Sequence, residues 1–250
     1  PERKGLNAVR SLLRQANATL NPQVLDEITA DRLASLIHGY RATGVKNSTA
    51  NNLLTLVSAV LNAAKGWGWL HTVPSVPKLP VTERRLRWLT REEADRLLVE
   101  LPAHLKPLVR FSLATGLRQQ NVAQLDWTQV DLERRIAWIH ADQAKGKRLI
   151  TVPLNADAVV VLREQQGQHS RYVFVHDGRP ILRPIAAGWY PALKRAGLEG
   201  FRWHDLRHTW ASWHVQAGTP LLVLKELGGW ANLEMVLRYA HLAPDHLAEH

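Results

Sequence analysis

The sequence predicts a mainly α-helical protein with a small antiparallel β-sheet, organised in two domains. Apolar residues recur at helical spacing along most of the chain, whereas β-branched and aromatic runs gather between residues 135 and 175. A Pro-rich stretch separates an all-helical first part from the rest. With 250 residues, of which 46% are hydrophobic, the chain is long enough to bury two separate cores.

The first domain is predicted to cover residues 1–80 and to be entirely helical. Three helices follow from apolar residues at helical spacing: Leu6, Val9, Leu12 and Leu13; Leu33, Leu36, Ile37 and Tyr40; Leu53, Leu54, Val57, Val60, Leu61 and Ala64. Ser48 is expected to cap the third helix, and Gly66 and Gly68 with the Pro-rich stretch that follows are expected to close the segment. The Pro-rich "HTVPSVPKLP" at 71–80 is interpreted as the linker region, and the linker between the domains is set at 81–88.

The second domain is predicted to cover residues 89–250. It opens with "LTREEADRLL", where Thr90 and Glu93 form a capping-box pattern ahead of an apolar helical face. Two runs, "RIAWIHA" and "RLITVPL", are joined by "DQAKGK" and predict a pair of strands. A third short run, "YVFV" at 172–175, is expected to join the same small sheet, and helical periodicity returns from about Ile185.

The charge balance indicates a polyanionic partner. Lys and Arg number 32 against 22 Asp and Glu, a formal net charge of +10, so nucleic acid is the first candidate and an anionic membrane surface the second. No apolar run is long enough to span a membrane, and no signal peptide is visible. The absence of cysteine excludes disulfides and thiolate chemistry and fits a reducing compartment, so we expect a cytoplasmic protein in a bacterial host. Because the chain begins at Pro1, we expect it to be a fragment of a longer protein.

Two separated segments each contain a basic residue that, taken alone, is weak evidence of a functional site. In "ATGLRQQNVAQLDW", Arg118 follows a turn-like Thr115-Gly116 pair and precedes a helical run. An arginine at a helix start is more often a surface or ion-paired residue than a functional one. Lys145 lies in the "AKGK" turn with Lys147 beside it, and a solvated hairpin tip is the simpler interpretation of both.

A third segment, "WHDLRHTWASW", is more informative. His204, Arg207 and His208 fall at i, i+3 and i+4 and share one face of a helix. Three potential cations on one face repel one another unless an anion binds there. Zinc is the alternative, because His204 and His208 have the spacing of a zinc-protease motif, but Asp205 replaces the glutamate and Arg207 would put a positive charge beside the metal.

The fourth segment has a tyrosine, Tyr239, nine residues after Trp230. In this order the four segments resemble the tyrosine recombinase family, the phage integrases and their relatives. "ATGLR" resembles the family's first arginine box, "HDLRHT" its His-x-x-Arg box, and "LGGW" followed by "RYAHL" its His/Trp position and nucleophilic tyrosine. The match covers about residues 88–242 as the catalytic domain, and the helical 1–80 resembles the core-binding, SAM-like domain that precedes it.

The resemblance implies a set of catalytic residues: Arg118, Lys145, His204, Arg207, Trp230 and Tyr239. Lys145 is favoured over Lys147 because its nine-residue distance to Leu154 fits the family's spacing, although the choice between the two lysines stays open. The sequence departs from the family pattern at Asn121, where an acidic residue is usual, so an acidic partner for Arg118 is in doubt. Trp230 stands where histidine is commoner.

The implied reaction is cleavage and rejoining of DNA through a 3′-phosphotyrosyl intermediate on Tyr239. A free phenol, with a pKa of about 10, is only ~0.1% ionised at pH 7, which leaves a deficit of roughly 4 kcal/mol that neighbouring groups must offset. His204 is the candidate to accept the phenolic proton, and His208 and His241 are outside candidates for supporting it.

The other implied roles concern the phosphate and the leaving group. Arg118 and Arg207 can grip the non-bridging oxygens through planar, always-charged forks. The indole N–H of Trp230 can donate a further hydrogen bond. Lys145 would protonate the departing 5′ oxygen, a role that comes from the resemblance alone.

The resemblance implies a site-specific recombinase that exchanges strands through a Holliday junction, with no cofactor and no metal. Its partners would be double-stranded DNA at the crossover sites, other copies in a tetramer on DNA, and in some cases a host bending protein or directionality factor. A type IB topoisomerase-like nicking-closing enzyme, a catalytically silent DNA-binding module and a zinc hydrolase are the alternatives. The target sequence, the spacer length and the choice among integration, excision and resolution stay open, as does the oligomeric state without DNA.

Overall fold

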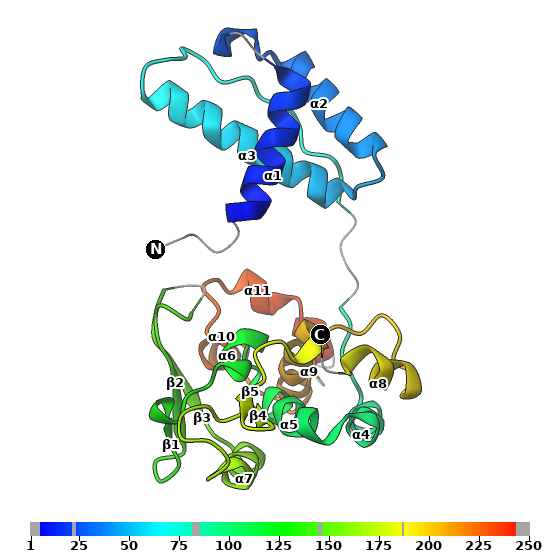
Figure 1. The fold of residues 1–250 in the computed structure, drawn as a ribbon, viewed down its shortest axis with the longest axis vertical. Coiled ribbons are helices and arrows are strands. Elements are labelled where there is room, and N and C mark those ends of the chain that lie inside the picture. The colour runs from blue at the N-terminus through cyan, green and yellow to red at the C-terminus, as the bar shows by residue number, and fades with distance from the viewer. Residues whose placement is uncertain (1–5, 22–23, 82–85, 145–146, 187, 244–250) are drawn as a thin grey trace, which may run out of the picture. The chain divides into compact units, whose positions relative to one another are not determined.

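The computed structural model describes residues 6–21, 24–81, 86–144, 147–186 and 188–243. The chain divides into two compact units, Pro1–Arg84 and Arg85–His250 (Figure 1). Each unit has its own buried apolar cluster. Within the described residues, no helix is both long enough and apolar enough to cross a membrane.

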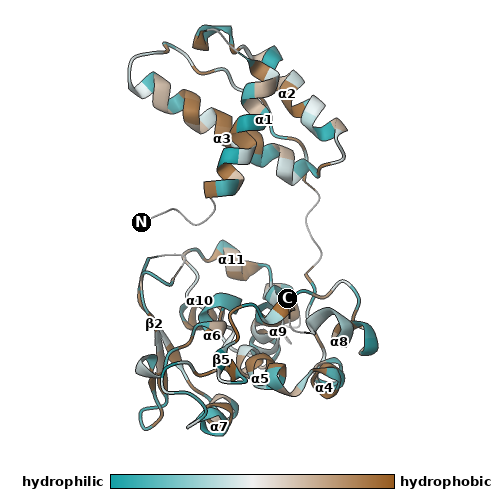
Figure 2. Ribbon diagram, in the orientation of Figure 1, coloured by the Kyte–Doolittle hydropathy of each residue, from teal (hydrophilic) through white to brown (hydrophobic). Residues whose placement is uncertain are grey.

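The first unit consists of three helices that pack against one another. Their bounds are α1 (Leu6–Leu20), α2 (Ala30–Ala42) and α3 (Asn47–Gly66). All three were predicted from apolar spacing. Of the two glycines predicted to close the third helix, Gly66 is its last residue and Gly68 lies beyond it. Figure 2 shows apolar and polar residues alternating along α3, as expected for a helix with one face toward the core. Leu33, Leu53 and Leu61 are at most 1% exposed and form the centre of this core.

Two details of the first unit differ from the sequence-based expectation. Ser48 does not cap α3, because the helix begins at Asn47, two residues earlier than predicted, and its N-cap is Lys46, whose side chain makes no capping hydrogen bond. Val9 in α1 is exposed, and the buried residues of that helix are Ala16 and Leu20. Only the C-terminal part of α1 therefore contributes buried side chains to the core.

The Pro-rich stretch at 71–80 packs against the first unit. The Asn51 side chain donates to the backbone carbonyl of Leu79 and accepts from its N–H, both at 2.9 Å. Val73, Val76 and Leu79 also lie against the core of this unit. Of the linker predicted at 81–88, residues 82–85 lie outside the described residues.

The second unit is a larger helical assembly. Its helices are α4 (Arg91–Glu100), α5 (Lys106–Thr115), α6 (Gln119–Ala123), α7 (Ala156–Gln165), α8 (Trp189–Arg195), α9 (Trp203–Gln216), α10 (Leu221–Gly228) and α11 (Glu234–Leu237). The capping box predicted at Thr90 and Glu93 is confirmed, with both reciprocal hydrogen bonds present at the start of α4. Helix α5 packs against both α7 and α9 (Figure 1), so it links the main core to the helix that carries the histidine-arginine segment.

Two small antiparallel sheets complete the second unit. Strands β1 (Val130–Asp131), β2 (Ile136–Ile139) and β3 (Ile150–Pro153) form one sheet in that order, and β2 and β3 confirm the two predicted strands. The expectation for 172–175 was wrong in part. Only Val175 is in a strand, β4 (Val175–His176), which pairs with β5 (Arg179–Pro180) in a separate hairpin. The backbone of Val173 bonds to Leu125 instead, and Phe174 is buried in the core.

A separate apolar cluster forms at the C-terminal end of the second unit. It is made by side chains of α9, α10 and the segment that follows them: Trp210, Ala211, Val215, Leu224, Trp230, Val236 and Tyr239. This C-terminal cluster holds the tryptophan and the tyrosine of the fourth sequence segment in one packed unit, beside the helix that carries Arg207.

Candidate active site

The turn after α5 places Arg118. Gly116 ends α5 with a left-handed φ of 64°, and a Cβ at this position would lie 2.2 Å from the Trp210 ring. Only glycine satisfies both the backbone and the close approach. Two residues later Arg118 is the N-cap of α6, and its side chain is half-buried. The "ATGLR" segment is therefore a tight turn that fixes an arginine next to α9.

Arg207 joins this turn to a second glycine turn, Gly228-Gly229, at the end of α10. Its Nη1 donates to the Gly116 carbonyl at 2.7 Å, and its Nη2 donates to the Gly228 carbonyl at 2.6 Å. The guanidinium also lies 4.0 Å from the centre of the Trp230 ring, within cation–π range. Arg207 is 4% exposed, so one buried fork ties together three segments that are far apart in the sequence.

The "LGGW" segment also needs glycine, because a tryptophan ring packs directly against its backbone. Gly229 ends α10 with a φ of 61°, and a Cβ on Gly228 would lie 2.0 Å from the Trp230 ring. The indole can therefore fold back over the glycine whose carbonyl Arg207 binds. Trp230 is 8% exposed and packs near Trp210, with ring centroids 6.0 Å apart.

The two arginines are electrostatically unbalanced. Burial, with the positive charge of Arg118 as a second cause, lowers the pKa of Arg207 to about 9. Burial also lowers the pKa of Arg118. Within the described parts of the chain, neither guanidinium forms an ion pair with a carboxylate. Two neighbouring cations without an anion favour binding of a phosphate-like group.

Tyr239 lies inside the C-terminal cluster and is 1% exposed. Its hydroxyl is 2.6 Å from Nδ1 of His208 on α9. Burial raises the pKa of Tyr239 to about 12, against the opposing effect of the nearby arginines. Burial, with His204 as a second cause, lowers the pKa of His208 to about 4. At neutral pH the contact therefore joins a neutral phenol to a neutral imidazole, with the phenol as donor when the ring proton is on Nε2.

His204 lies one turn before His208 on α9, and its side chain is partly exposed to solvent and partly packed against neighbouring groups. The two rings meet edge to face, with centroids 5.1 Å apart. Burial of the imidazole, together with the charge of Arg207, lowers the pKa of His204. The Asp205 carboxylate is paired with Arg202 at 2.6 Å. Among the residues described, no group of three His, Cys, Asp or Glu side chains is placed to hold a metal ion.

Of the remaining predicted positions, the structure describes Asn121 but not Lys145. Lys145 lies outside the described residues. Lys147 is exposed, with a left-handed φ of 49°. Asn121 is buried, and its side-chain amide donates to the Gln143 carbonyl at 3.4 Å. This long contact links α6 to the turn that follows β2, and no hydrogen bond joins Asn121 to Arg118 among the described residues.

A comparison with known proteins agrees with this arrangement. The model of the "Phage integrase family" matches residues 87–246, which include every segment described above. The chain belongs to the phage integrase family. The family match covers the second unit, from which all the candidate site residues come.

Individual relatives of this integrase-family chain extend the likeness. The integrase of Salmonella phage P22 is 47% identical over 211 residues, which is 79% of this chain and 54% of the relative. Lambda integrase, solved as a dimer bound to a COC′ core site, shares the fold with a TM-score of 0.79 at 20% identity, over 96% of this chain and 89% of that one. Lambda integrase has also been solved as a tetramer bound to a Holliday junction, with a TM-score of 0.76 at 19% identity, over 99% of this chain and 73% of that one. The chain spans about half the length of the P22 integrase.

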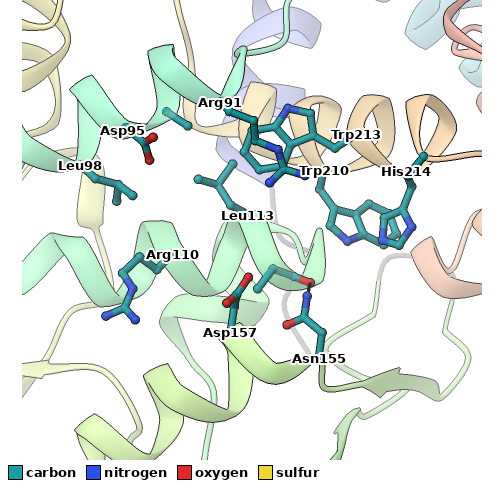
Figure 3. A pocket seen from close by; sticks show the side chains of 13 residues that line it. Arg91, Asp95, Leu98, Arg110, Leu113, Asn155, Asp157, Trp210, Trp213 and His214 are labelled. Atoms are coloured by element: carbon teal, nitrogen blue, oxygen red, sulfur yellow. Dashed lines mark hydrogen bonds between the residues drawn. The ribbon is translucent and has the colours of Figure 1, made fainter.

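The family member also has a pocket of about 410 Å³ among α4, α5, α7 and α9. Figure 3 shows Trp210, Trp213 and His214 of α9 along one side of it, with Asp157 and Asn155 opposite. None of the five predicted catalytic residues that the structure describes lines this pocket. The pocket is therefore separate from the residues that the sequence predicts to be catalytic.

Two features of the candidate site escaped the sequence analysis. The first is that Arg207 binds the carbonyls of Gly116 and Gly228. The sequence held one clue to these contacts, because each glycine turn lies within two residues of a predicted site residue. The second is that the hydroxyl of Tyr239 contacts His208, which the sequence offered only as an outside candidate. Its position one turn after His204 on the same helix face was the available clue.

Proposed function

We propose that the chain is the core of a site-specific DNA recombinase, which cleaves and rejoins DNA through a phosphotyrosyl intermediate. Residues 1–80 would form the core-binding, SAM-like domain and residues 89–250 the catalytic domain, with the linker at 81–88. The family membership supports this proposal. The P22 relative, named an integrase, supports it further.

The observation that carries the proposal is a tyrosine beside Arg207, which lies near Arg118; neither of these two arginines has a carboxylate partner among the described residues. The charges of Arg207 and Arg238 both act to lower the pKa of Tyr239. The charge of Arg118 in turn acts on Arg207. A phosphodiester bound between the arginines would supply the missing negative charge and would bring phosphorus to the phenol.

The proposed reaction uses each group in a distinct way. Tyr239 attacks phosphorus and the 5′ oxygen leaves, so one diester replaces another and no energy source is needed. Arg118 and Arg207 stabilise the charge on the non-bridging oxygens, with Trp230 as a further donor. His204, on the exposed side of α9, would contact the same phosphate. Lys145 would protonate the departing oxygen, a role taken from the family resemblance.

The burial of Tyr239 adds a step before attack. At 1% exposure the hydroxyl is covered, so the segment from α11 to η5 (Ala240–Leu242) must shift before a DNA phosphate can reach it. Three apolar side chains at α11 are exposed among the described residues: Leu233, Met235 and Leu237. DNA binding is expected to move this segment.

The proposed partners are crossover-site DNA duplexes and further copies of the same chain. Lambda integrase has been solved as a tetramer bound to a Holliday junction, and we propose the same assembly here. A host bending protein or directionality factor would act in some reactions. The place of action would be the bacterial cytoplasm, at the nucleoid, and neither a metal nor a nucleotide cofactor is proposed.

The proposal is tested with labelled duplexes that carry a nick near the crossover, drawn from the junctions of the element that encodes the chain. Cleavage on such a duplex releases a short strand, which traps the covalent intermediate. The protein is expected to form a protein–DNA adduct that survives denaturing electrophoresis. Tyr239→Phe should form none.

Tyr190→Phe is the matched control, because Tyr190 is 62% exposed on α8 and lies outside the site. This variant should form the adduct as the unmodified protein does. If both unmodified protein and Tyr190→Phe bind DNA without forming an adduct on any junction, the enzyme proposal is wrong and a DNA-binding module remains. Relaxation of supercoiled plasmid without exchange between duplexes would favour a topoisomerase-like enzyme instead.

A further inference from the structure

Two tryptophans at the end of α3 are exposed, in contrast to the other tryptophans of the chain. All ten lie in the described residues, and the other eight are buried or half-buried. Trp67 and Trp69 are each 65% exposed, and their ring centroids are 4.8 Å apart. Tryptophan is highly buried on average in folded proteins. An exposed pair of tryptophans therefore indicates a contact with a partner outside the chain.

The backbone holds this tryptophan pair in a fixed place. Trp67 is the C-cap of α3, and Gly68 follows it with a left-handed φ of 78°. The N–H of Gly68 donates to the Lys65 carbonyl at 3.0 Å, and the N–H of Trp69 donates to the Ala64 carbonyl at 2.9 Å. These two bonds form a Schellman motif, in which the residue after the glycine commonly packs against the last helical turn. Trp69 is exposed instead, so both rings are presented to solvent from a rigid turn.

The charge of the first unit indicates which partner covers the pair. Among its described residues there are seven Lys and Arg and three Asp and Glu, and no acidic residue occurs between Leu33 and Val81. Lys65 is exposed and forms no ion pair within the described residues. Such a surface repels the same surface of a second copy and attracts a polyanion. Charge complementarity therefore favours DNA over a second copy of the chain.

We propose that Trp67 and Trp69 bind DNA with their ring faces, against sugar and base surfaces, beside a phosphate held by Lys65. The inference rests on the proposed function, in which residues 1–80 form the core-binding domain. Aromatic side chains stack on bases of any sequence, because every base has a π-face. Apolar side chains also enter the minor groove and separate neighbouring base pairs. The tryptophans add affinity that is independent of salt, whereas the contact of Lys65 adds affinity that salt weakens.

Acrylamide quenching of tryptophan fluorescence tests the contact in the whole chain. Acrylamide reaches exposed indoles, so Trp67 and Trp69 should account for most of the quenching in the free protein. A duplex from the junctions of the element that encodes the chain should protect this fluorescence. In Trp67→Phe/Trp69→Phe the quenching should be low, and DNA should change it little. Quenching of the unmodified protein that stays the same when DNA saturates it would overturn the inference.

The second measurement is the affinity for the same duplex, by fluorescence anisotropy between about 50 and 200 mM salt. Trp67→Ala/Trp69→Ala should bind about tenfold more weakly, or weaker still, at every salt concentration. Its slope of log affinity against log salt should match that of the unmodified protein. Lys65→Gln should instead reduce the slope by about 0.9, the value of one phosphate contact. Trp67→Phe/Trp69→Phe should keep most of the affinity, because it keeps two aromatic faces.

Tyr190→Ala is the matched control for the loss of an exposed aromatic ring. Tyr190 is 62% exposed on α8 of the second unit, and its removal should leave DNA affinity unchanged. Far-ultraviolet circular dichroism should be the same for all variants, because neither Trp67 nor Trp69 belongs to the buried core of the first unit. A loss of affinity in the alanine variant then reports the contact and not the fold.

The inference is overturned if the alanine variant binds DNA as tightly as the unmodified protein at every salt concentration. It is also overturned if the variant keeps its DNA affinity but sediments differently without DNA, which would assign the pair to a contact between copies. If the unmodified protein binds no junction duplex, the proposed function itself fails. Tight binding by both proteins would leave the proposed function intact and remove only the role of the tryptophans.

Discussion

At the scale of single residues, Arg118 and Arg207 repel each other electrostatically in the structure without DNA. A half-buried guanidinium faces a nearly fully buried one, and no carboxylate balances the pair within the described residues. Such an arrangement lowers stability in exchange for anion binding, which is a common property of active sites. Removing the charge of Arg118 should therefore raise the stability of the protein and lower its activity.

Arg118→Gln is expected to raise the free energy of unfolding by about 1 kcal/mol at low salt without DNA. The reason is that it removes the charge that opposes protonated Arg207. The same change should abolish adduct formation. Urea unfolding measures the first effect. Arg134→Gln, at an exposed site, is the control and should change stability by less than about 0.5 kcal/mol. A loss of stability in Arg118→Gln would contradict the account.

His208 predicts a pH dependence of stability. Its pKa is about 4 in the folded protein, below the ordinary value of 6.5. The unfolded chain therefore binds more protons between these values, so stability should be complete above about pH 6.5 and should fall as the pH drops toward 4. His204 and His214 have lowered pKa values and act in the same direction.

The measurement is the free energy of unfolding at several pH values from 7 to 4.5. His208→Asn should show a flatter decline than the unmodified protein, because an amide does not titrate. If the free energy of unfolding falls equally with pH in both proteins, His208 does not contribute to the pH dependence as predicted. The groups that face His208 and set its pKa are Tyr239, His204, Asp205, Arg238 and Arg202.

At this scale the sequence predicted which residue types gather, but not how they pair. The spacing of His204, Arg207 and His208 on one helix face could be calculated from helix geometry alone. The partner of Tyr239 could not, because it depends on how the segment after α10 packs back onto α9. The predicted proton acceptor was His204, and the hydroxyl lies instead against His208.

At the scale of elements, two glycine turns bring the site together. Gly116 ends α5 and Gly229 ends α10, and the carbonyls of Gly116 and Gly228 are bridged by Arg207. The turns depend on positive φ and on close approach of tryptophan rings, so their glycines are structural requirements of the site.

Gly116→Ala should destabilise the protein by about 2 kcal/mol or more, because the new methyl group would meet the Trp210 ring as well as a strained backbone. Gly197→Ala is the matched control: Gly197 has a similar φ of 69°, and a Cβ there would meet nothing within 4 Å. It should cost only about 1 kcal/mol. Thermal unfolding of the two variants isolates the Trp210 contact, and equal losses would argue against it.

Elements with strong local signals were predicted well, and short ones were not. Helices α2 and α3 and the capping box of α4 follow from periodicity and from the pair Thr90 and Glu93. The two-residue strands β1, β4 and β5 carry too little sequence to show a period, and their pairing is set by the surrounding core. The third run at 172–175 was misassigned because burial in a core and burial in a sheet give the same apolar pattern.

At the scale of the whole molecule, the chain has two compact units with separate cores and a formal charge of +10. Separate cores imply that each unit can fold by itself. If both contact DNA, as proposed, the whole chain neutralises more phosphates than the second unit alone.

The second unit, residues 85–250, is expected to fold alone and to bind duplex DNA more weakly than the whole chain. The affinity of the whole chain should also fall more steeply with salt, because more counterions are released from the DNA. Fluorescence anisotropy between about 50 and 200 mM salt compares the two slopes. Circular dichroism confirms that the fragment is folded. Equal slopes would show that residues 1–84 make no phosphate contacts.

The central claim is that Tyr239 becomes linked to the 3′ phosphate of a cleaved DNA strand. The most direct test is to trap the adduct on a nicked duplex, digest protein and DNA, and map the modified peptide by mass spectrometry. The chain has four tyrosines, so the assignment is clear. The account predicts a nucleotide attached through its 3′ phosphate to Tyr239 alone. A nucleotide on Tyr190 or another side chain, or attachment through a 5′ phosphate, would contradict it.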